Sequence, residues 1–196
     1  MKQSREKNER EIRMAELRAA PEEEKMIVEG YAAIFEHPAT HYGFTEIIDR
    51  SAFAGTEMRD VPMRYNHNDS WLILARTRNG SLQLTVDEKG LFMRAELIDT
   101  QANRDVYKSV QAGLLDKMSF AFTTAKDEWN YGTDTRRVLE IERLFDVSVV
   151  DTPFYDTTSI YARALDELES GKRALESEKT RRLTIEKLKV KTKEKV

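Results

Sequence analysis

The sequence predicts a mainly β (α+β) protein: an antiparallel β-barrel of about seven short strands with accessory helices, flanked by charged helical arms. Three observations support this fold class. Residues 26–163 contain every aromatic residue and all but one of the eight glycines. Short apolar segments separated by turn residues recur along this stretch, as they do in barrels and curved sheets. The flanking segments 1–25 and 164–196 are dense in charge and poor in apolar residues.

The first segment, residues 1–25, has the composition of a charged arm. It holds seven basic and seven acidic residues. Arg5–Ala19 is predicted to form a helix that ends before Pro21, because proline cannot continue a helix. The apolar stripe of this helix is thin, so an arm that orders only on contact with other surfaces is an alternative.

Short strands are predicted along the first half of the central domain. They are Met26–Phe35, Thr45–Ile48, Pro62–Tyr65, Leu72–Thr77, Ser81–Val86 and Leu91–Leu97. Gly30 is expected to form a bulge or bend in the first of these strands. Leu82, Leu84 and Val86 alternate along one face of their strand. Asp87–Gly90 has the composition of a hairpin turn, which joins the last two strands.

One helix and three further strands are predicted in the second half of the domain. Thr100 caps a helix that runs to about Ala112, with Val106 and Val110 on its apolar face and Gly113 at its C′ position. The strands are Met118–Ala125, Arg136–Leu144 and Val147–Val150, with a polar connection at 129–134.

The last segment, residues 164–196, is predicted to be helical and rich in lysine. It holds ten basic and seven acidic residues. Its leucine, isoleucine and valine residues are spaced irregularly, so the sequence does not establish a coiled coil.

Composition excludes several classes of function. The chain has no cysteine, which removes disulfides, thiol chemistry and cysteine-based zinc sites. The N-terminal sequence MKQSREKNER lacks the apolar stretch of a signal peptide, and no apolar run is long enough to span a membrane. A net charge of −3 gives no general argument for a nucleic-acid partner. We therefore expect a soluble intracellular protein.

The three histidines stand in two settings. His37 and His41 lie four apart, but Pro38 prevents the regular helix on which such a pair binds a metal. They are interpreted as exposed loop residues. His67 follows a short predicted strand among hydrogen-bonding side chains, where it is a candidate general base or a structural histidine.

A serine within an apolar strand is the candidate nucleophile. Ser119 lies between Met118 and Phe120, and a buried hydroxyl needs a hydrogen-bond partner. That partner is either a backbone carbonyl, which would make the serine structural, or a histidine, which would activate it.

A carboxylate that orients the imidazole would complete such a site. Asp146 begins a strongly apolar strand and is the first candidate, with Glu142, Asp151 and Asp69 as competitors. Ser148 is two residues along on the same strand face as Asp146, where it either supports the site or merely packs.

Six segments in order resemble the prohead proteases of tailed bacteriophages with HK97-type capsids. They are VEGYAAIF (28–35), EIIDRSAF (46–53), YNHND (65–69), DEKGLFMRAEL (87–97), GLLDKMSFAF (113–122) and LFDVSVVDTPFYDTTSIYAR (144–163). The resemblance covers residues 28–163 and implies a fold like that of the herpesvirus assembly proteases. Carried over to this chain, it implies His67 as base, Ser119 as nucleophile and Asp146 as the third member.

The resemblance also implies a working context. The chain is expected to be a serine endopeptidase without a cofactor that cleaves the scaffolding segment of the major capsid protein precursor, and itself, inside the immature prohead in the host cytoplasm. A homodimer or higher oligomer is possible, and no membrane or specific nucleic-acid partner is expected. The charged arms would hold the enzyme against scaffold or shell, or the tail is simply a solvated helix removed by self-cleavage.

Three other functions compete with this interpretation. A non-enzymatic scaffolding module is the main alternative, because scaffolds are often helical and highly charged. A serine esterase is disfavoured, since no Gly-x-Ser-x-Gly elbow surrounds Ser119. A metal hydrolase built on His37, His41 and His67 is less favoured still.

Overall fold

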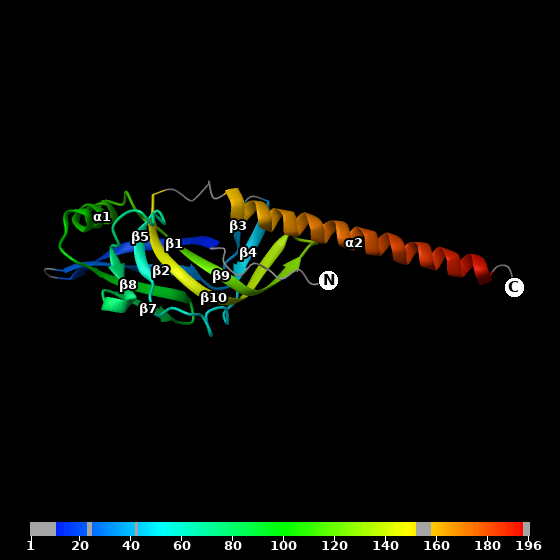
Figure 1. Ribbon diagram of the computed structural model, residues 1–196, viewed down its shortest axis with the longest axis horizontal. Coiled ribbons are helices and arrows are strands. Elements are labelled where there is room, and N and C mark those ends of the chain that lie inside the picture. The colour runs from blue at the N-terminus through cyan, green and yellow to red at the C-terminus, as the bar shows by residue number, and fades with distance from the viewer. Residues whose placement is uncertain (1–10, 23–24, 42, 152–157, 194–196) are drawn as a thin grey trace.

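The computed structural model describes residues 11–22, 25–41, 43–151 and 158–193. Ten strands in this part of the chain form one sheet in the order β3-β4-β10-β9-β1-β2-β8-β7, with β5 attached to β10 and β6 to β5 (Figure 1). The strands are β1 (Glu11–Glu22), β2 (Lys25–Ile34), β3 (Ala39–His41), β4 (Phe44–Ile48), β5 (Pro62–Tyr65), β6 (Ala75–Arg76), β7 (Leu82–Val86), β8 (Gly90–Leu97), β9 (Lys117–Asn130) and β10 (Thr135–Val150). The helices are η1 (Thr77–Asn79), α1 (Gln101–Gln111) and α2 (Thr158–Lys193).

The mainly β fold class is confirmed, but the structure shows no closed barrel. Within the described residues, β6 contacts β7 and β8 without forming a hydrogen-bonded ladder with them. The pairing is also mixed, since β4 and β5 both run parallel to β10. This is possible because β10 has 16 residues, enough for β4 to pair near its beginning and β5 near its end. The likeness to herpesvirus proteases stays a prediction.

The helix predicted at Arg5–Ala19 is wrong where the structure describes this segment. Residues 11–22 form β1, which pairs with β9 through its first half and with β2 through its second half. Intrinsic helix propensity is a weak preference that tertiary hydrogen bonding overrides. Residues 11–22 are therefore part of the sheet, while the functional division at residues 25 and 163 stays a prediction.

Most of the other predicted strands are confirmed, with differences at irregular positions. The strand predicted at Leu72–Thr77 is reduced to β6. Gly30 pairs in register with Met93, and the irregularity in β2 lies between Tyr31 and Ala33 instead. The two strands predicted at 136–144 and 147–150 are one continuous strand, β10, with a register shift against β9 between Leu144 and Asp146.

The helix α1 forms as predicted. The Thr100 side chain accepts a hydrogen bond from the Asn103 backbone N–H at the helix start. Gly113 follows the C-terminal cap with a φ of 69°, a left-handed conformation that glycine adopts without steric cost. Val106 and Val110 are buried on the apolar face, which packs against β1 and β2.

The two faces of the β9–β10 pair have different roles. Met118, Phe120 and Phe122 on β9 join Val147 and Val149 on β10 in the main hydrophobic core. Residues at the alternate positions of these strands project from the opposite face. That opposite face is buried too but carries polar residues, Ser119 on β9 and Asp146 and Ser148 on β10. A buried polar face of this kind needs internal hydrogen bonds.

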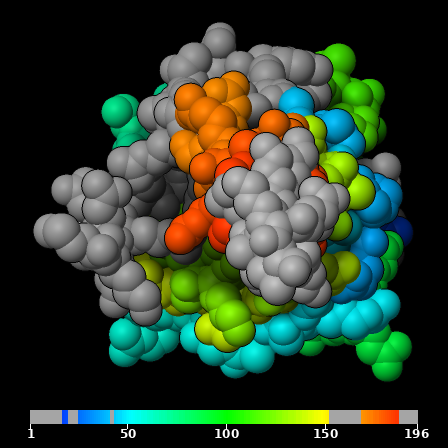
Figure 2. Space-filling model, turned by 90° about the vertical axis from the view of Figure 1, so that its right-hand side faces the viewer, coloured from blue at the N-terminus to red at the C-terminus, as the bar shows by residue number. Residues whose placement is uncertain are grey.

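Helix α2 packs against the tip of the β9–β10 hairpin and then projects away from the sheet (Figure 1). Leu168 is buried, and Lys172 forms an ion pair of 2.6 Å with Asp134. A Cβ at Gly171 would lie 2.2 Å from the Tyr131 ring, so a larger residue there would require the ring to move. Figure 2 views the molecule from the end toward which the described helix (orange to red) projects. No helix in the described ranges has the length and apolar character needed to cross a membrane.

Candidate active site

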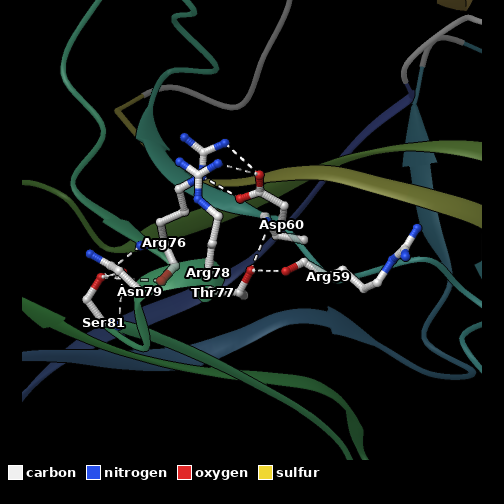
Figure 3. A network of polar contacts seen from close by, with 8 residues as sticks. Arg59, Asp60, Arg76, Thr77, Arg78, Asn79 and Ser81 are labelled. Carbon is white, nitrogen blue, oxygen red and sulfur yellow. Dashed lines mark hydrogen bonds and ion pairs between the residues drawn. The ribbon is translucent and has the colours of Figure 1, made fainter.

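A polar network fixes the start of β5, the strand that leads to His67 (Figure 3). Asp60 accepts two hydrogen bonds from the Arg76 guanidinium, and hydrogen bonding to Arg76 is the main cause that lowers the pKa of the Asp60 carboxyl. The Thr77 hydroxyl accepts from the Val61 N–H at 2.8 Å and donates to the Arg59 carbonyl at 3.2 Å. The network joins the residues before β5 to β6 and η1, so β5 enters the sheet in a defined position.

His67 follows β5 in a tight turn with a left-handed backbone. Asn66 and His67 have φ values of 51° and 52°, and the Asn68 N–H donates to the Tyr65 carbonyl at 3.1 Å. Two consecutive residues with positive φ are typical of a type I′ turn, a conformation that Asn and His tolerate better than most residues. The Asn66 N–H donates to the Val149 carbonyl at 2.9 Å, which fastens the turn to β10.

This turn brings His67 onto Asp146, although 79 residues separate them in the chain. The Nδ1 atom of His67 lies 2.6 Å from Oδ1 of Asp146. The two side chains are 6% and 0% exposed, respectively. Ser148 Oγ donates to the same Asp146 oxygen at 2.8 Å and accepts from the His67 backbone N–H at 3.2 Å. A buried imidazole, carboxylate and hydroxyl therefore form one hydrogen-bonded cluster.

Ser119 lies on the strand next to this cluster. Its register partner on β10 is Ser148, and paired residues of antiparallel strands project from the same face. The side chain of Ser119 is fully buried, and among the described residues its Oγ has no hydrogen-bond partner. The structure thus brings His67 and Asp146 into contact and places Ser119 on the adjacent strand without a hydrogen bond to His67.

The competing carboxylates are engaged elsewhere or lie at the surface. Asp69 pairs with Arg64 at 3.2 Å, and Asp151 accepts a hydrogen bond of 2.7 Å from the Tyr65 hydroxyl. This hydrogen bond is the main reason that the pKa of Tyr65 is raised above its usual value. Glu142 is exposed. Asp146, by contrast, contacts the His67 imidazole.

The other two histidines lie in and before β3. His37 is exposed in the loop before β3, and His41 belongs to β3 with its side chain outside the described part. Across the described residues, no group of three or more His, Asp or Glu side chains is arranged to hold a metal ion.

Sequence reasoning missed Arg64. It pairs with Ser148 in the parallel β5–β10 ladder, so it lies on the same face of the sheet as the cluster. Its Nη1 donates to the Asn68 carbonyl at 3.1 Å, and Nη2 contacts Asp69. The arginine thereby braces the turn that carries His67. Its position three residues before a candidate base was the available signal, but strand pairing was needed to interpret it.

Comparison with known proteins identifies the family. The family model of the caudovirus prohead serine proteases matches residues 12–172, so the chain belongs to this family. The prohead protease of Enterobacteria phage HK97 is 29% identical over 149 residues, which cover 74% of this chain and 63% of that protein. This chain thus matches less than two thirds of the length of its relative.

One solved structure is a weaker match. The bacteriophage T4 capsid assembly protease gp21 has a TM-score of 0.46 and 10% sequence identity, covering 74% of this chain and all of that one.

Proposed function

We propose that this chain is a serine endopeptidase that cleaves the scaffolding segment of the major capsid protein precursor, and itself, inside the immature prohead. Family membership supports a protease. The observation that carries the assignment of residues is the contact of 2.6 Å between His67 and Asp146, next to the strand that holds Ser119. An imidazole held by a carboxylate beside a buried serine is the arrangement that activates a hydroxyl nucleophile.

The proposed reaction is acyl transfer. Ser119 Oγ attacks the carbonyl carbon of a peptide bond, and its proton moves to Nε2 of His67. When the tetrahedral intermediate collapses, the C–N bond breaks and His67 gives this proton to the leaving amine. Water then hydrolyses the acyl-enzyme by the same route, with His67 as base. Asp146 holds the ring so that Nδ1 carries a proton and Nε2 faces the reaction.

Two serines lie side by side on this face, and their hydrogen bonds favour Ser119 as the nucleophile. The Ser148 hydroxyl donates its proton to Asp146 and accepts from the His67 backbone. The Ser119 hydroxyl has no such partner among the described residues. Only a hydroxyl that is free to give its proton to the imidazole can attack, which is the role of Ser119.

The proposal requires the Ser119 side chain to move slightly and the groups that bury it to open. Attack requires Ser119 Oγ to lie about 3 Å from the imidazole, a distance that is often longer before substrate binds. Rotation about the Cα–Cβ bond of Ser119 moves its oxygen without moving the strand. Because Ser119 is fully buried, the peptide must also displace the groups that cover it.

The test is co-expression of the full chain with the major capsid protein precursor of the same phage. Ser119→Ala should abolish precursor cleavage, a loss of more than about 1,000-fold, while circular dichroism and the melting temperature show a folded protein. Ser109→Ala is the matched control, because the Ser109 hydroxyl lies on α1, where it donates to the backbone carbonyl of Asp105. Cleavage that persists in Ser119→Ala would contradict the proposal.

A non-enzymatic scaffolding role is the second candidate, and helix α2 is the observation that favours it. Its described residues beyond Lys172 are exposed, as expected of a helix that contacts another protein. The same experiment separates the two functions. A scaffold predicts normal assembly and no serine-dependent cleavage in the wild type, whereas the peptidase predicts cleavage that Ser119→Ala removes.

A further inference from the structure

The turn that holds His67 has a backbone conformation that needs external support. A left-handed backbone costs roughly 1–2 kcal/mol for a residue other than glycine, and here Asn66 and His67 are both left-handed. The hydrogen bonds of the Asn66 and Asn68 N–H groups fix the peptide group before Asn66 and the one after His67. The N–H of His67 itself is bonded by a side chain, the hydroxyl of Ser148.

Ser148 contacts both partners of the His67–Asp146 pair. Its hydroxyl donates to Oδ1 of Asp146 at 2.8 Å and accepts the His67 N–H at 3.2 Å. The Nδ1 atom of His67 contacts the same Oδ1, so each of the three residues touches the other two. This closed ring of contacts fixes the position of the Asp146 carboxylate oxygen and of the His67 backbone at the same time. The Ser148 side chain is fully buried, so water does not compete for these bonds.

Strand pairing places this ring beside Ser119. Ser148 pairs with Arg64 on β5 and with Ser119 on β9. Neighbouring strands lie about 4.8 Å apart. Ser148 thus occupies the position between the strand that leads to His67 and the strand that carries Ser119. A shift of its hydroxyl would change the distance between base and nucleophile.

We infer that Ser148 is a positioning residue, which holds His67 and Asp146 in the geometry that lets the imidazole accept a proton from Ser119. This inference rests on the proposed peptidase function. Ser148 does not itself touch the reacting atoms. Its loss should slow the chemical step and leave ligand binding nearly unchanged, because the hydrogen bonds hold the base and not the substrate.

The test is the rate at which a fluorophosphonate probe labels Ser119 in the full chain, since this reaction needs no knowledge of the preferred peptide. Ser148→Ala should lower the maximal labelling rate by roughly 10- to 100-fold, the factor that corresponds to a hydrogen bond with a charged group. The probe concentration at half-maximal rate should stay nearly constant. Ser148→Thr, which keeps the hydroxyl, should recover most of the rate.

The control is a second serine that donates to an aspartate two residues before it. Ser51 Oγ bonds Asp49 Oδ1 at 2.7 Å, in a turn that follows β4. Ser51→Ala removes the same kind of hydrogen bond and should label at the wild-type rate. Wild-type labelling in Ser148→Ala, or an equal loss in Ser148→Ala and Ser148→Thr, would overturn the inference. If Ser148→Ala does not fold, Ser148→Cys provides a similar volume with weaker hydrogen bonds. Its labelling rate should also fall, and a wild-type rate would overturn the inference.

Proton NMR separates this inference from the proposed function. The Nδ1–H of His67, bonded to Asp146, should give a low-field resonance that His67→Ala removes. That resonance should shift or broaden in Ser148→Ala and stay unchanged in Ser51→Ala. If the probe does not label Ser119 in the wild type, the proposed peptidase fails, and the resonance alone decides whether Ser148 positions the imidazole. An unchanged resonance in Ser148→Ala would then refute the positioning role.

Discussion

The two ends of β10 hold buried carboxylates in opposite ways. Near its end, Asp146 accepts hydrogen bonds from an imidazole and a hydroxyl. Near its beginning, Arg136 is buried between Glu46 and Asp127, at 3.0 and 2.7 Å. A guanidinium never gives up its proton in a protein, whereas an imidazole exchanges one near neutral pH. The same strand therefore carries a cluster suited to proton transfer at one end and a permanently charged structural cluster at the other.

The largest effect is expected at the proton-transfer end. Asp146→Ala removes the oxygen that accepts from both His67 and Ser148, and should lower fluorophosphonate labelling of Ser119 by about 1,000- to 10,000-fold. Asp146→Asn should lose less activity. Both hydrogen bonds go to a single oxygen, which an amide can still provide, so Asn removes the charge and keeps the ring orientation.

The control for this prediction is Asp151→Asn, which changes a nearby carboxylate that bonds Tyr65. It should label at nearly the wild-type rate. A greater loss in Asp151→Asn than in Asp146→Asn would reassign the third member of the site.

These two ends also differ in how far the sequence revealed them. Residue type and local setting make His67, Ser119 and Asp146 candidates among others, and the resemblance of short segments to a known family selects them; no spacing between them does so. The register of β5, β10 and β9 brings these three residues to one face of the sheet. The pairing register of distant strands cannot be predicted from a single sequence. For the same reason, the sequence does not decide whether Ser148 supports the site or only packs.

The sequence-based errors in the fold have related causes. Residues 11–22 are rich in helix-forming residues, yet they form β1 because β9 and β2 provide hydrogen-bonding partners on both sides. The apparent break between Leu144 and Val147 is a register shift within one strand. The sequence predicts Gly90 in a turn, but Gly90 also permits a close strand approach, since a Cβ there would lie 2.0 Å from the Ala33 carbonyl oxygen. Long-range pairing decided each of these positions.

At the structural end, the prediction concerns stability and not chemistry. Arg136→Met should lower the free energy of unfolding by about 3–5 kcal/mol, because it leaves Glu46 and Asp127 buried without their cation. Urea denaturation followed by fluorescence measures this change. Labelling of Ser119 per folded molecule should stay close to that of the wild type, since Arg136 lies roughly 30 Å along the strand from Asp146.

The adjacent residue provides the matched control. Arg137 also pairs with two carboxylates, Glu36 and Asp49, but all three side chains are a quarter to a third exposed. Arg137→Met should therefore cost at most about 1 kcal/mol. Equal losses in the two variants would show that burial does not distinguish these clusters.

The smallest expected effect is the acid dependence of the Arg137 cluster. The hydrogen bond from Arg137 lowers the pKa of Glu36. Hydrogen bonds from Ser51, and then from Arg137, lower the pKa of Asp49. In the unfolded chain these groups titrate near about 4.3 and 3.9. A carboxyl whose folded pKa is depressed stabilises the fold above its unfolded pKa, and this contribution is lost as the pH falls through the folded value.

The contribution of Glu36 and Asp49 to the free energy of unfolding should therefore be constant above about pH 5. It should decline below about pH 4. Arg137→Gln reduces the depression of both pKa values, so its unfolding free energy should be lower than that of the wild type at pH 7, by less than about 1 kcal/mol. The difference should shrink as both carboxyls become protonated. Urea denaturation from pH 7 to pH 3 measures it, and Arg59→Gln, whose side chain is 86% exposed, is the control. A difference that stays constant down to pH 3 would mean that Arg137 contributes through packing of its side chain and not through its charge.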